Sequence, residues 1–239
     1  MPSLDSIRSQ METSNGIGSL NEKALHLTLK KYFDPDETHH EIPVGRFVAD
    51  IKNGDRIIEI ETRSFSNLRN KLPALLDKNY VTVVYPVSER TTFIVVDENG
   101  EHIKKGRSTK KGRPTDIFGE LLKISQYIGN PHLSFTIILL DTLEYRVPVD
   151  RRGRKSSKRT DRIATSVNGF IELKSKDDIS GLVTIPDGEF SADSFSRSNR
   201  LKQYDAWKAL KVLENIGCIA CSKEKRPFIY TKQIDNPVV

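Results

Sequence analysis

Residues 47–61 hold two apolar runs on either side of Asn53-Gly54, and this segment constrains the fold more than any other. Asn-Gly between alternating β-branched residues is the strongest short-range signal for a β-hairpin, and it favours a two-residue type I′ turn. With Asn53 and Gly54 at the turn centre, Asp50 should pair with Ile57. The segment therefore predicts two antiparallel strands in a fixed register.

Side chains alternate between the two faces of a strand, so the hairpin residues divide into two sets. One set is apolar and should pack on the core: Phe47, Ala49, Ile51, Ile58 and Ile60. The other set contains three carboxylates and two apolar residues: Val48, Asp50, Ile57, Glu59 and Glu61. In the predicted register Asp50 and Glu59 are diagonal neighbours, about 7–8 Å apart.

Clustered carboxylates repel one another unless a proton or a cation intervenes. Mg²⁺ is the natural cation for hard oxygen ligands. The acid-bearing face of the hairpin therefore predicts a divalent-metal site at Asp50 and Glu59. An exposed strand face with ordinary glutamates is the alternative.

The sequence around the hairpin predicts alternating helices and strands. Apolar periodicity gives the order helix, three strands, helix, strand. The predicted ranges are 19–33, 39–44, 46–52, 56–62, 65–78 and 80–87. A hairpin over 91–105, a helix over 116–128 and a strand over 134–147 should follow.

The C-terminal part changes character after about residue 176. A short helix over 191–198, a turn at 199–201 and an amphipathic helix over 202–217 precede two short strands around a basic turn. Helix, turn, helix and hairpin is the layout of a winged helix-turn-helix, whose second helix lies in the DNA major groove. A small α+β cap without a role in DNA binding is the alternative.

The net charge of +6 is unevenly distributed, because much of it lies in two basic runs at 104–113 and 151–162. Either run alone is compatible with a solvated loop, and the second is predicted to be a linker. Two such runs in one chain favour a phosphate-bearing partner. The sequence shows no apolar run long enough to span a membrane and no secretory signal, so we expect a cytoplasmic protein that does not bind membranes.

The order of elements, with Asp50 on the second strand and Glu59-Ile60-Glu61 on the third, resembles the PD-(D/E)xK nuclease superfamily over roughly residues 19–87. Ala49 stands where the signature has Pro, and Glu61 stands where Lys is usual. Some type II restriction enzymes of this superfamily also have Glu there. The resemblance implies an α/β fold with a restriction-endonuclease-like αβββαβ core and a mixed sheet.

The resemblance also implies phosphodiester hydrolysis with Mg²⁺ or Mn²⁺ held by Asp50 and Glu59. Glu61 would accept a proton from the attacking water or orient it, and Arg63 would supply a cation or bind a phosphate. Many members add a Glu from the first helix, which Glu22 matches. Glu22 equally fits a capping box at the start of that helix.

These observations predict a nuclease-like domain over 1–150, a basic linker over 151–175 and a winged-helix domain over 176–239. The predicted DNA contacts are Arg63, Ser64, Lys110, Lys111, Arg113, Lys202, Gln203, Lys223, Lys225 and Arg226. A metal-dependent endonuclease acting on duplex DNA is the first functional hypothesis. A non-catalytic DNA-binding or regulatory protein with a degenerate nuclease fold is the second, and a protein-interaction module is the third. A symmetric double-strand cut would need two active sites, as in a homodimer.

Overall fold

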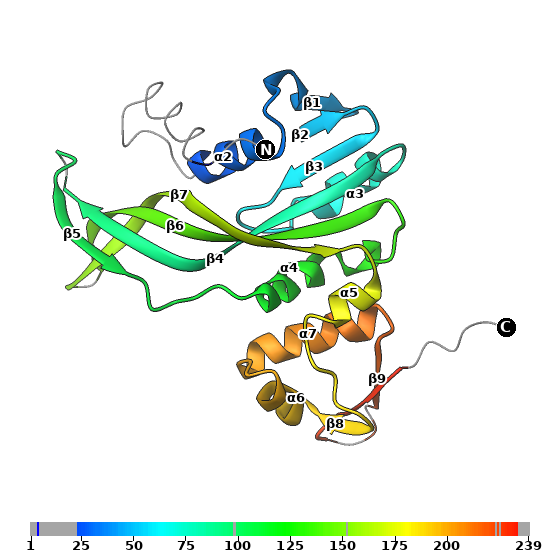
Figure 1. Ribbon diagram of the computed structural model, residues 1–239. Helices are drawn as coiled ribbons and strands as arrows, with labels where there is room; N and C mark the ends of the chain where they lie inside the picture. Colours follow the sequence, from blue (N-terminus) through cyan, green and yellow to red (C-terminus); the bar gives the residue numbers. More distant parts are fainter. Residues whose placement is uncertain are drawn as a thin grey trace. The chain divides into compact units, whose positions relative to one another are not determined.

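The computed structural model describes Leu4 and residues 23–97, 99–151, 153–222, 224 and 226–233 (Figure 1). The chain divides into two units, and each unit combines three stretches of sequence. The first unit comprises residues 1–62, 82–113 and 136–171, and the second comprises residues 63–81, 114–135 and 172–239. The chain passes back and forth between the units, whereas the sequence predicts consecutive domains over 1–150 and 176–239.

The protein is mixed α/β, as predicted, and its main element is a mixed seven-stranded sheet. The first elements occur in the predicted order of helix, three strands, helix and strand. They are α2 (Lys23–Phe33), η1 (Glu37–His39), β1 (His40–Val44), β2 (Phe47–Asn53), β3 (Arg56–Ile60), α3 (Leu68–Leu76) and β4 (Tyr80–Val96). The elements that follow are β5 (His102–Arg107), η2 (Pro114–Ile117), α4 (Phe118–Leu121), η3 (Leu122–Tyr127), β6 (Leu133–Arg151) and β7 (Arg154–Leu173).

The strands of the large sheet lie in the order β1-β2-β3-β4-β6-β7, and β5 also pairs with β4. The Glu61 N–H donates to the carbonyl of Val84, which lies in the first part of β4. The second part of β4 pairs with β5 instead, from Thr92 opposite Arg107 onward. A single long strand therefore supports the acid-bearing hairpin at one end and the β4–β5 hairpin at the other.

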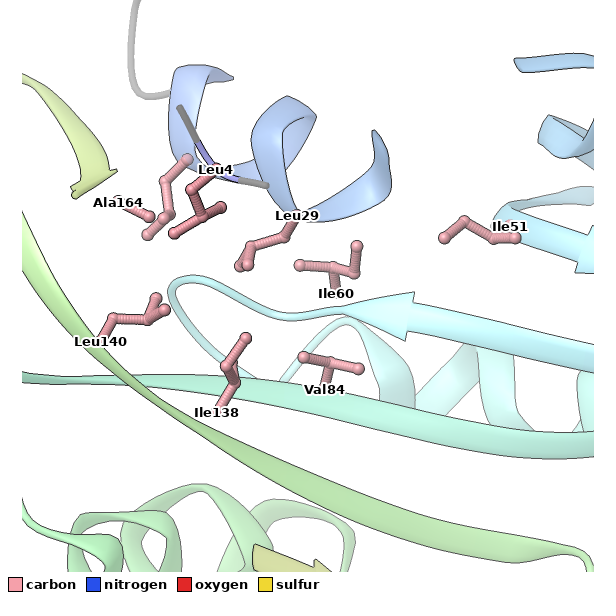
Figure 2. Packing of buried hydrophobic residues seen from close by; sticks show 9 residues of the cluster. Leu4, Leu29, Ile51, Ile60, Val84, Ile138, Leu140 and Ala164 are labelled. Carbon is pink, nitrogen blue, oxygen red and sulfur yellow. The ribbon is translucent and has the colours of Figure 1, made fainter. Parts of the chain in front are cut away.

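Helix α2 covers one face of this sheet through an apolar cluster (Figure 2). Leu29 is fully buried and points from the helix toward the strands (Figure 2). The labelled strand residues of the cluster are Ile51, Ile60, Val84, Ile138, Leu140 and Ala164, and Leu4 joins the same cluster. The face of the hairpin that was predicted to be apolar thus lies against the core, and α2 is held beside the two strands that carry the acids.

The basic stretch 151–162 is not the predicted linker. Residues 154–173 form strand β7, which pairs with β6 at the end of the large sheet. The Thr160 hydroxyl donates to the Tyr145 carbonyl across this pair, at 3.1 Å. The segment lacks the apolar alternation of a half-buried strand, and pairing with the adjacent strand β6 accounts for its conformation.

The second unit contains several short elements besides α3. After β7 they are α5 (Lys176–Ser180), β8 (Glu189–Ser191), α6 (Ala192–Ser198), α7 (Gln203–Asn215), β9 (Ile219–Ser222) and β10 (Ile229–Lys232). Strands β8, β10 and β9 form a small antiparallel sheet in that order. Ser191 caps α6 as predicted, and Gly217 ends α7 in a positive-φ conformation (+81°) that suits glycine.

The helix predicted over 116–128 is divided into η2, α4 and η3, and Ile124 within η3 has non-helical backbone angles (φ −129°, ψ 20°). Helix α7 packs against both α4 and η3. The Asn215 side chain donates to Ser125 Oγ at 3.0 Å, and Phe118, Leu121 and Ile124 are buried. The C-terminal elements therefore pack on residues 114–127 within the second unit.

No helix in the described part of the chain is both long and apolar enough to cross a membrane.

Candidate active site and nucleic-acid interface

The hairpin of β2 and β3 differs from the prediction in its register. Asn53 pairs with Arg56, and Ile51 pairs with Ile58, so the two-residue loop is Gly54-Asp55. Gly54 has the positive φ (+61°) that such a loop requires. The slip is two residues, and the side-chain period of a strand is also two, so each residue keeps its predicted face. Continued by one pair, the observed register sets Asp50 directly opposite Glu59 rather than diagonal to it.

The two carboxylates make reciprocal hydrogen bonds across the strand pair. Asp50 Oδ2 accepts the backbone N–H of Ile60 at 2.7 Å, and Glu59 Oε1 accepts the backbone N–H of Asp50 at 3.3 Å. Glu59 is 1% exposed, whereas the Asp50 side chain is 17% exposed. Burying a carboxylate is costly unless it is hydrogen-bonded or paired, and these contacts supply part of that compensation. The predicted metal-site pair is thus brought together on one face of the hairpin.

His26 of α2 completes this group, and it was absent from the sequence-based prediction. Its Nε2 lies 3.1 Å from Asp50 Oδ2, and its side chain is 27% exposed. The neighbouring Leu25 is buried in the core, and His26, the next residue of α2, contacts Asp50 of β2. The site therefore draws on α2, β2 and β3, the first helix and the second and third strands of the fold.

The other three predicted catalytic residues are Glu61, Arg63 and Glu22, and the structure describes the positions of the first two. Glu61 follows directly after β3, is partly exposed, and donates its backbone N–H to Val84 at 3.0 Å. Arg63 is exposed and belongs to the second unit. Glu22 lies outside the described residues, so neither its catalytic role nor the capping box is placed.

The donor set favours one class of metal. In the described part of the chain, no group of three or more His, Cys, Asp or Glu side chains could hold a metal ion. This excludes a closed site of four protein ligands among these residues, such as structural zinc. Mg²⁺ in proteins commonly takes one or two carboxylates and keeps water or phosphate at its other positions. The pair Asp50 and Glu59 fits that requirement.

Ser64, a predicted DNA contact, is held by contacts within the second unit. Its Oγ accepts a hydrogen bond from Lys123 Nζ at 2.9 Å and lies 3.0 Å from Ser66 Oγ. Lys123 also pairs with Glu120 at 2.7 Å, and Glu120 accepts the Phe65 N–H at 2.8 Å. This network fixes the segment that leads into α3.

The N-terminal half of α7 presents an exposed aromatic and basic surface. Tyr204 and Trp207 are 67% and 46% exposed, and their rings stack with centroids 6.1 Å apart. Lys208 Nζ lies 4.1 Å from the Tyr204 ring centroid. The predicted contact Lys202 is exposed at the start of the helix, and exposed Gln203 donates to Asp193 at 2.9 Å. Exposed aromatic rings beside cations are typical of surfaces that bind nucleic acid or protein.

The remaining predicted DNA contacts are basic residues of loops. Lys110, Lys111 and Arg113 are exposed in the segment after β5. Arg226 is exposed between β9 and β10, with its guanidinium 5.7 Å from the Phe228 ring centroid. Lys223 and Lys225 lie outside the described residues.

Residues 23–174 match a protein family described as "Domain of unknown function (DUF8091)". The chain belongs to this family. An uncharacterized protein of Treponema pallidum (strain Nichols) is 30% identical to it over 164 residues, which cover 67% of this chain and 65% of the Treponema protein. No solved structure matches the chain. The DUF8091 match runs from the start of α2 to the end of β7, so it contains the acid-bearing hairpin and His26 and stops just before α5.

Proposed function

We propose that this DUF8091 protein is a metal-dependent endonuclease that hydrolyses phosphodiester bonds in duplex DNA. The observation that carries the proposal is that Asp50 and Glu59 lie opposite each other on β2 and β3, with His26 of α2 3.1 Å from the Asp50 carboxylate. Two opposed carboxylates beside a helix residue, within a helix-strand-strand-strand-helix-strand order, are the features by which the chain resembles the PD-(D/E)xK superfamily. The restriction-endonuclease-like core belongs to this proposal.

Asp50 and Glu59 are the residues that would hold Mg²⁺ or Mn²⁺. Such an ion, when bound, supplies charge stabilisation at a phosphoryl oxygen and lowers the pKa of a bound water. His26 acts as a positioning residue, since its contact with Asp50 fixes the orientation of that carboxylate. Glu61 accepts a proton from the attacking water or orients that water. Arg63 contributes a cation that binds a phosphate of the substrate.

The C-terminal elements support a targeting role. Helix α6, the turn at 199–201, α7 and the β9–β10 hairpin follow one another as in a winged helix-turn-helix, and α7 would enter the DNA major groove. Lys202, Gln203 and Trp207 are exposed on the N-terminal half of α7, the part of a recognition helix that contacts base edges. Arg226 in the turn after β9 suits a phosphate contact.

Cleavage of supercoiled plasmid tests this function. The wild-type protein should convert supercoiled plasmid to nicked and linear forms in the presence of Mg²⁺ or Mn²⁺, and chelation should stop the reaction. Asp50→Asn keeps the size of the side chain and should not cleave, whereas Asp55→Asn in the loop of the same hairpin should cleave normally. Equal cleavage by wild-type protein and Asp50→Asn would reject the proposed site.

Non-catalytic DNA binding is the second candidate function. Two observations favour it: Glu61 stands where the superfamily has Lys, and both Asp50 and Glu59 accept backbone N–H groups, as purely structural carboxylates would. Under this alternative the protein binds duplex DNA but leaves plasmid intact with every divalent ion.

Trp207 gives a direct readout of DNA binding that both candidates require. It is the single Trp of the chain, so intrinsic Trp fluorescence reports on α7 alone. Saturating duplex DNA should quench this fluorescence, and Trp207→Ala should weaken binding by about 1–2 kcal/mol, as for an exposed aromatic residue that becomes buried in an interface. If anisotropy shows binding while Trp207 fluorescence stays constant, α7 does not touch the DNA.

A further inference from the structure

The positive charge of the protein is concentrated in two stretches, residues 88–113 and 141–162, which we call the β-arm. Together they contain 15 Lys or Arg and eight Asp or Glu, a net charge of +7. The whole chain has a net charge of +6, so the remaining residues are close to neutral. A local excess of this size creates a surface potential that attracts polyanions.

The fold joins the two stretches into one four-stranded segment. Strand β5 pairs with the second part of β4, with Ile94 opposite Lys105 and Val95 opposite Lys104. Strand β6 lies on the other side of β4, and the Thr91 and Thr142 hydroxyls are 3.1 Å apart. Strand β7 continues the sheet beyond β6 (Figure 1). The two basic runs of the sequence therefore belong to one segment of the sheet, on β5 and β7, with β4 and β6 between them.

Acidic residues of the β-arm are occupied by internal partners. Glu144 pairs with Arg146 at 2.6 Å and with Arg159 at 3.2 Å. Burial raises the pKa of Glu144, but the hydrogen bonds and charges of these two arginines outweigh it and leave the pKa below its usual value. Asp141 accepts a hydrogen bond from Asn168 at 2.9 Å. These two carboxylates interact with residues of β6 and β7 and not with the cations of β5.

The cations of β5 are exposed. Lys104, Lys105 and Arg107 make no ion pair with any residue that the structure describes, and all three are exposed. Alternate residues on a strand lie about 6.6–6.8 Å apart on the same face, so Lys105 and Arg107 share one face of β5 and Lys104 lies on the other. Because β5 pairs only with β4 among the described strands, its exposed cations lie along an edge of the sheet that an extended polyanion can follow.

The strand that carries these cations is held firmly on β4. The Arg146 guanidinium lies 4.3 Å from the Phe93 ring centroid, a cation–π contact. Gly106 lies against the same ring, since a Cβ at that position would come within 2.7 Å of the Phe93 ring. Gly106, between Lys105 and Arg107, thus lets β5 pack closely against the Phe93 ring.

We propose that the β-arm binds the phosphate backbone of duplex DNA through Lys104, Lys105 and Arg107. The proposal rests on the function proposed above and names the surface that holds the substrate without reading its sequence. Phosphate contacts of this kind position a protein on DNA, and base contacts from another element specify the site. Lysines on an edge strand also prevent sheets from pairing edge to edge, so the experiment must separate binding from that role.

The test compares two variants of equal charge change. The triple variant Lys104→Gln, Lys105→Gln, Arg107→Gln removes the β5 cations. The control Arg46→Gln, Lys52→Gln, Arg56→Gln removes three cations from the turns of β1, β2 and β3 in the same unit. Binding of a 20-base-pair duplex is followed by fluorescence anisotropy between 50 and 200 mM salt, without divalent ions.

We expect the β5 variant to bind at least about tenfold more weakly at the lowest salt, with a log–log salt slope shallower by about two to three. The control should stay within about twofold of wild type. Lys110→Gln with Lys111→Gln, in the loop after β5, should change the slope in the same direction by about two. Equal losses in the β5 variant and the control, or no loss in either, would overturn the proposal.

Two further outcomes are informative. If the β5 variant binds anionic phosphatidylserine vesicles more weakly than wild-type protein does but binds duplex DNA equally well, the surface binds a membrane and the proposal is wrong. If wild-type protein never cleaves DNA but the β5 variant still loses duplex binding, the endonuclease function fails and the β-arm proposal stands. Because binding is measured without metal, the two failures are distinguishable.

Discussion

Glu61→Gln should slow cleavage of duplex DNA at least about a hundredfold while leaving duplex binding unchanged. The amide keeps the size and hydrogen-bonding capacity of the side chain but cannot accept the proton of the attacking water. General-base contributions are typically of this magnitude or larger. Single-turnover cleavage rates, measured beside anisotropy titrations with the same duplex, separate loss of chemistry from loss of binding.

Glu61→Lys provides an informative comparison, because Lys is usual at this position in the superfamily that the chain resembles. It should retain more activity than Glu61→Gln, since a Lys ammonium can stabilise negative charge on the phosphate. Asp55→Asn, on the exposed loop of the same hairpin, is the matched control and should cleave at the wild-type rate. Wild-type cleavage by Glu61→Gln would show that Glu61 is neither the base nor the residue that orients the water.

The sequence predicted the hairpin and its two faces, but not which residues pair. The sequence predicts Asn53-Gly54 as the turn centre, whereas Asn53 is the last residue of β2 and Gly54-Asp55 is the loop. The two arrangements place the same side chains on the same faces, so apolar patterning does not distinguish them. The reciprocal bonds of Asp50 and Glu59 to the opposite backbone accompany the observed register, and no local propensity encodes them.

The sequence predicts a linker at 151–162 because a high density of charged residues is typical of linkers, whereas most of this run lies in β7. Its residues lack apolar alternation, and their conformation comes from pairing with β6, whose first half (FTIILL) is strongly β-forming and buried. Strand propensity depends strongly on the neighbouring strand. The strand conformation of a polar segment that pairs with a long strand is therefore difficult to predict from its own sequence.

Helix α7 was predicted with its buried face correct, including Ala206, Leu210 and Leu213, because a 3.6-residue apolar period is a strong local signal. Its packing on α4 and η3 could not be predicted, since that contact joins segments about 90 residues apart. His26 was missed for a related reason. Its approach to Asp50 depends on how α2 rotates over the sheet, which is set by Leu25 and Leu29 in the core.

The central claim is that Asp50 and Glu59 hold a divalent metal ion, and Mn²⁺-dependent thermal stability tests it most directly. A ligand that binds only the native state stabilises that state by about 2.7 kcal/mol at a concentration one hundredfold above its Kd. The increment needs neither substrate nor catalysis, so it is independent of the identity of the nucleic acid. Asp50→Asn and Glu59→Gln each remove one carboxylate while preserving side-chain size, and Asp55→Asn serves as the control.

Thermal unfolding of the four proteins should be recorded over a Mn²⁺ titration. Wild-type protein and Asp55→Asn should gain stability with increasing Mn²⁺, and the gain should be largely absent in Asp50→Asn and Glu59→Gln. An identical gain in all four proteins, or none in wild-type protein, would contradict the account and leave the two carboxylates as structural acceptors of the hairpin backbone.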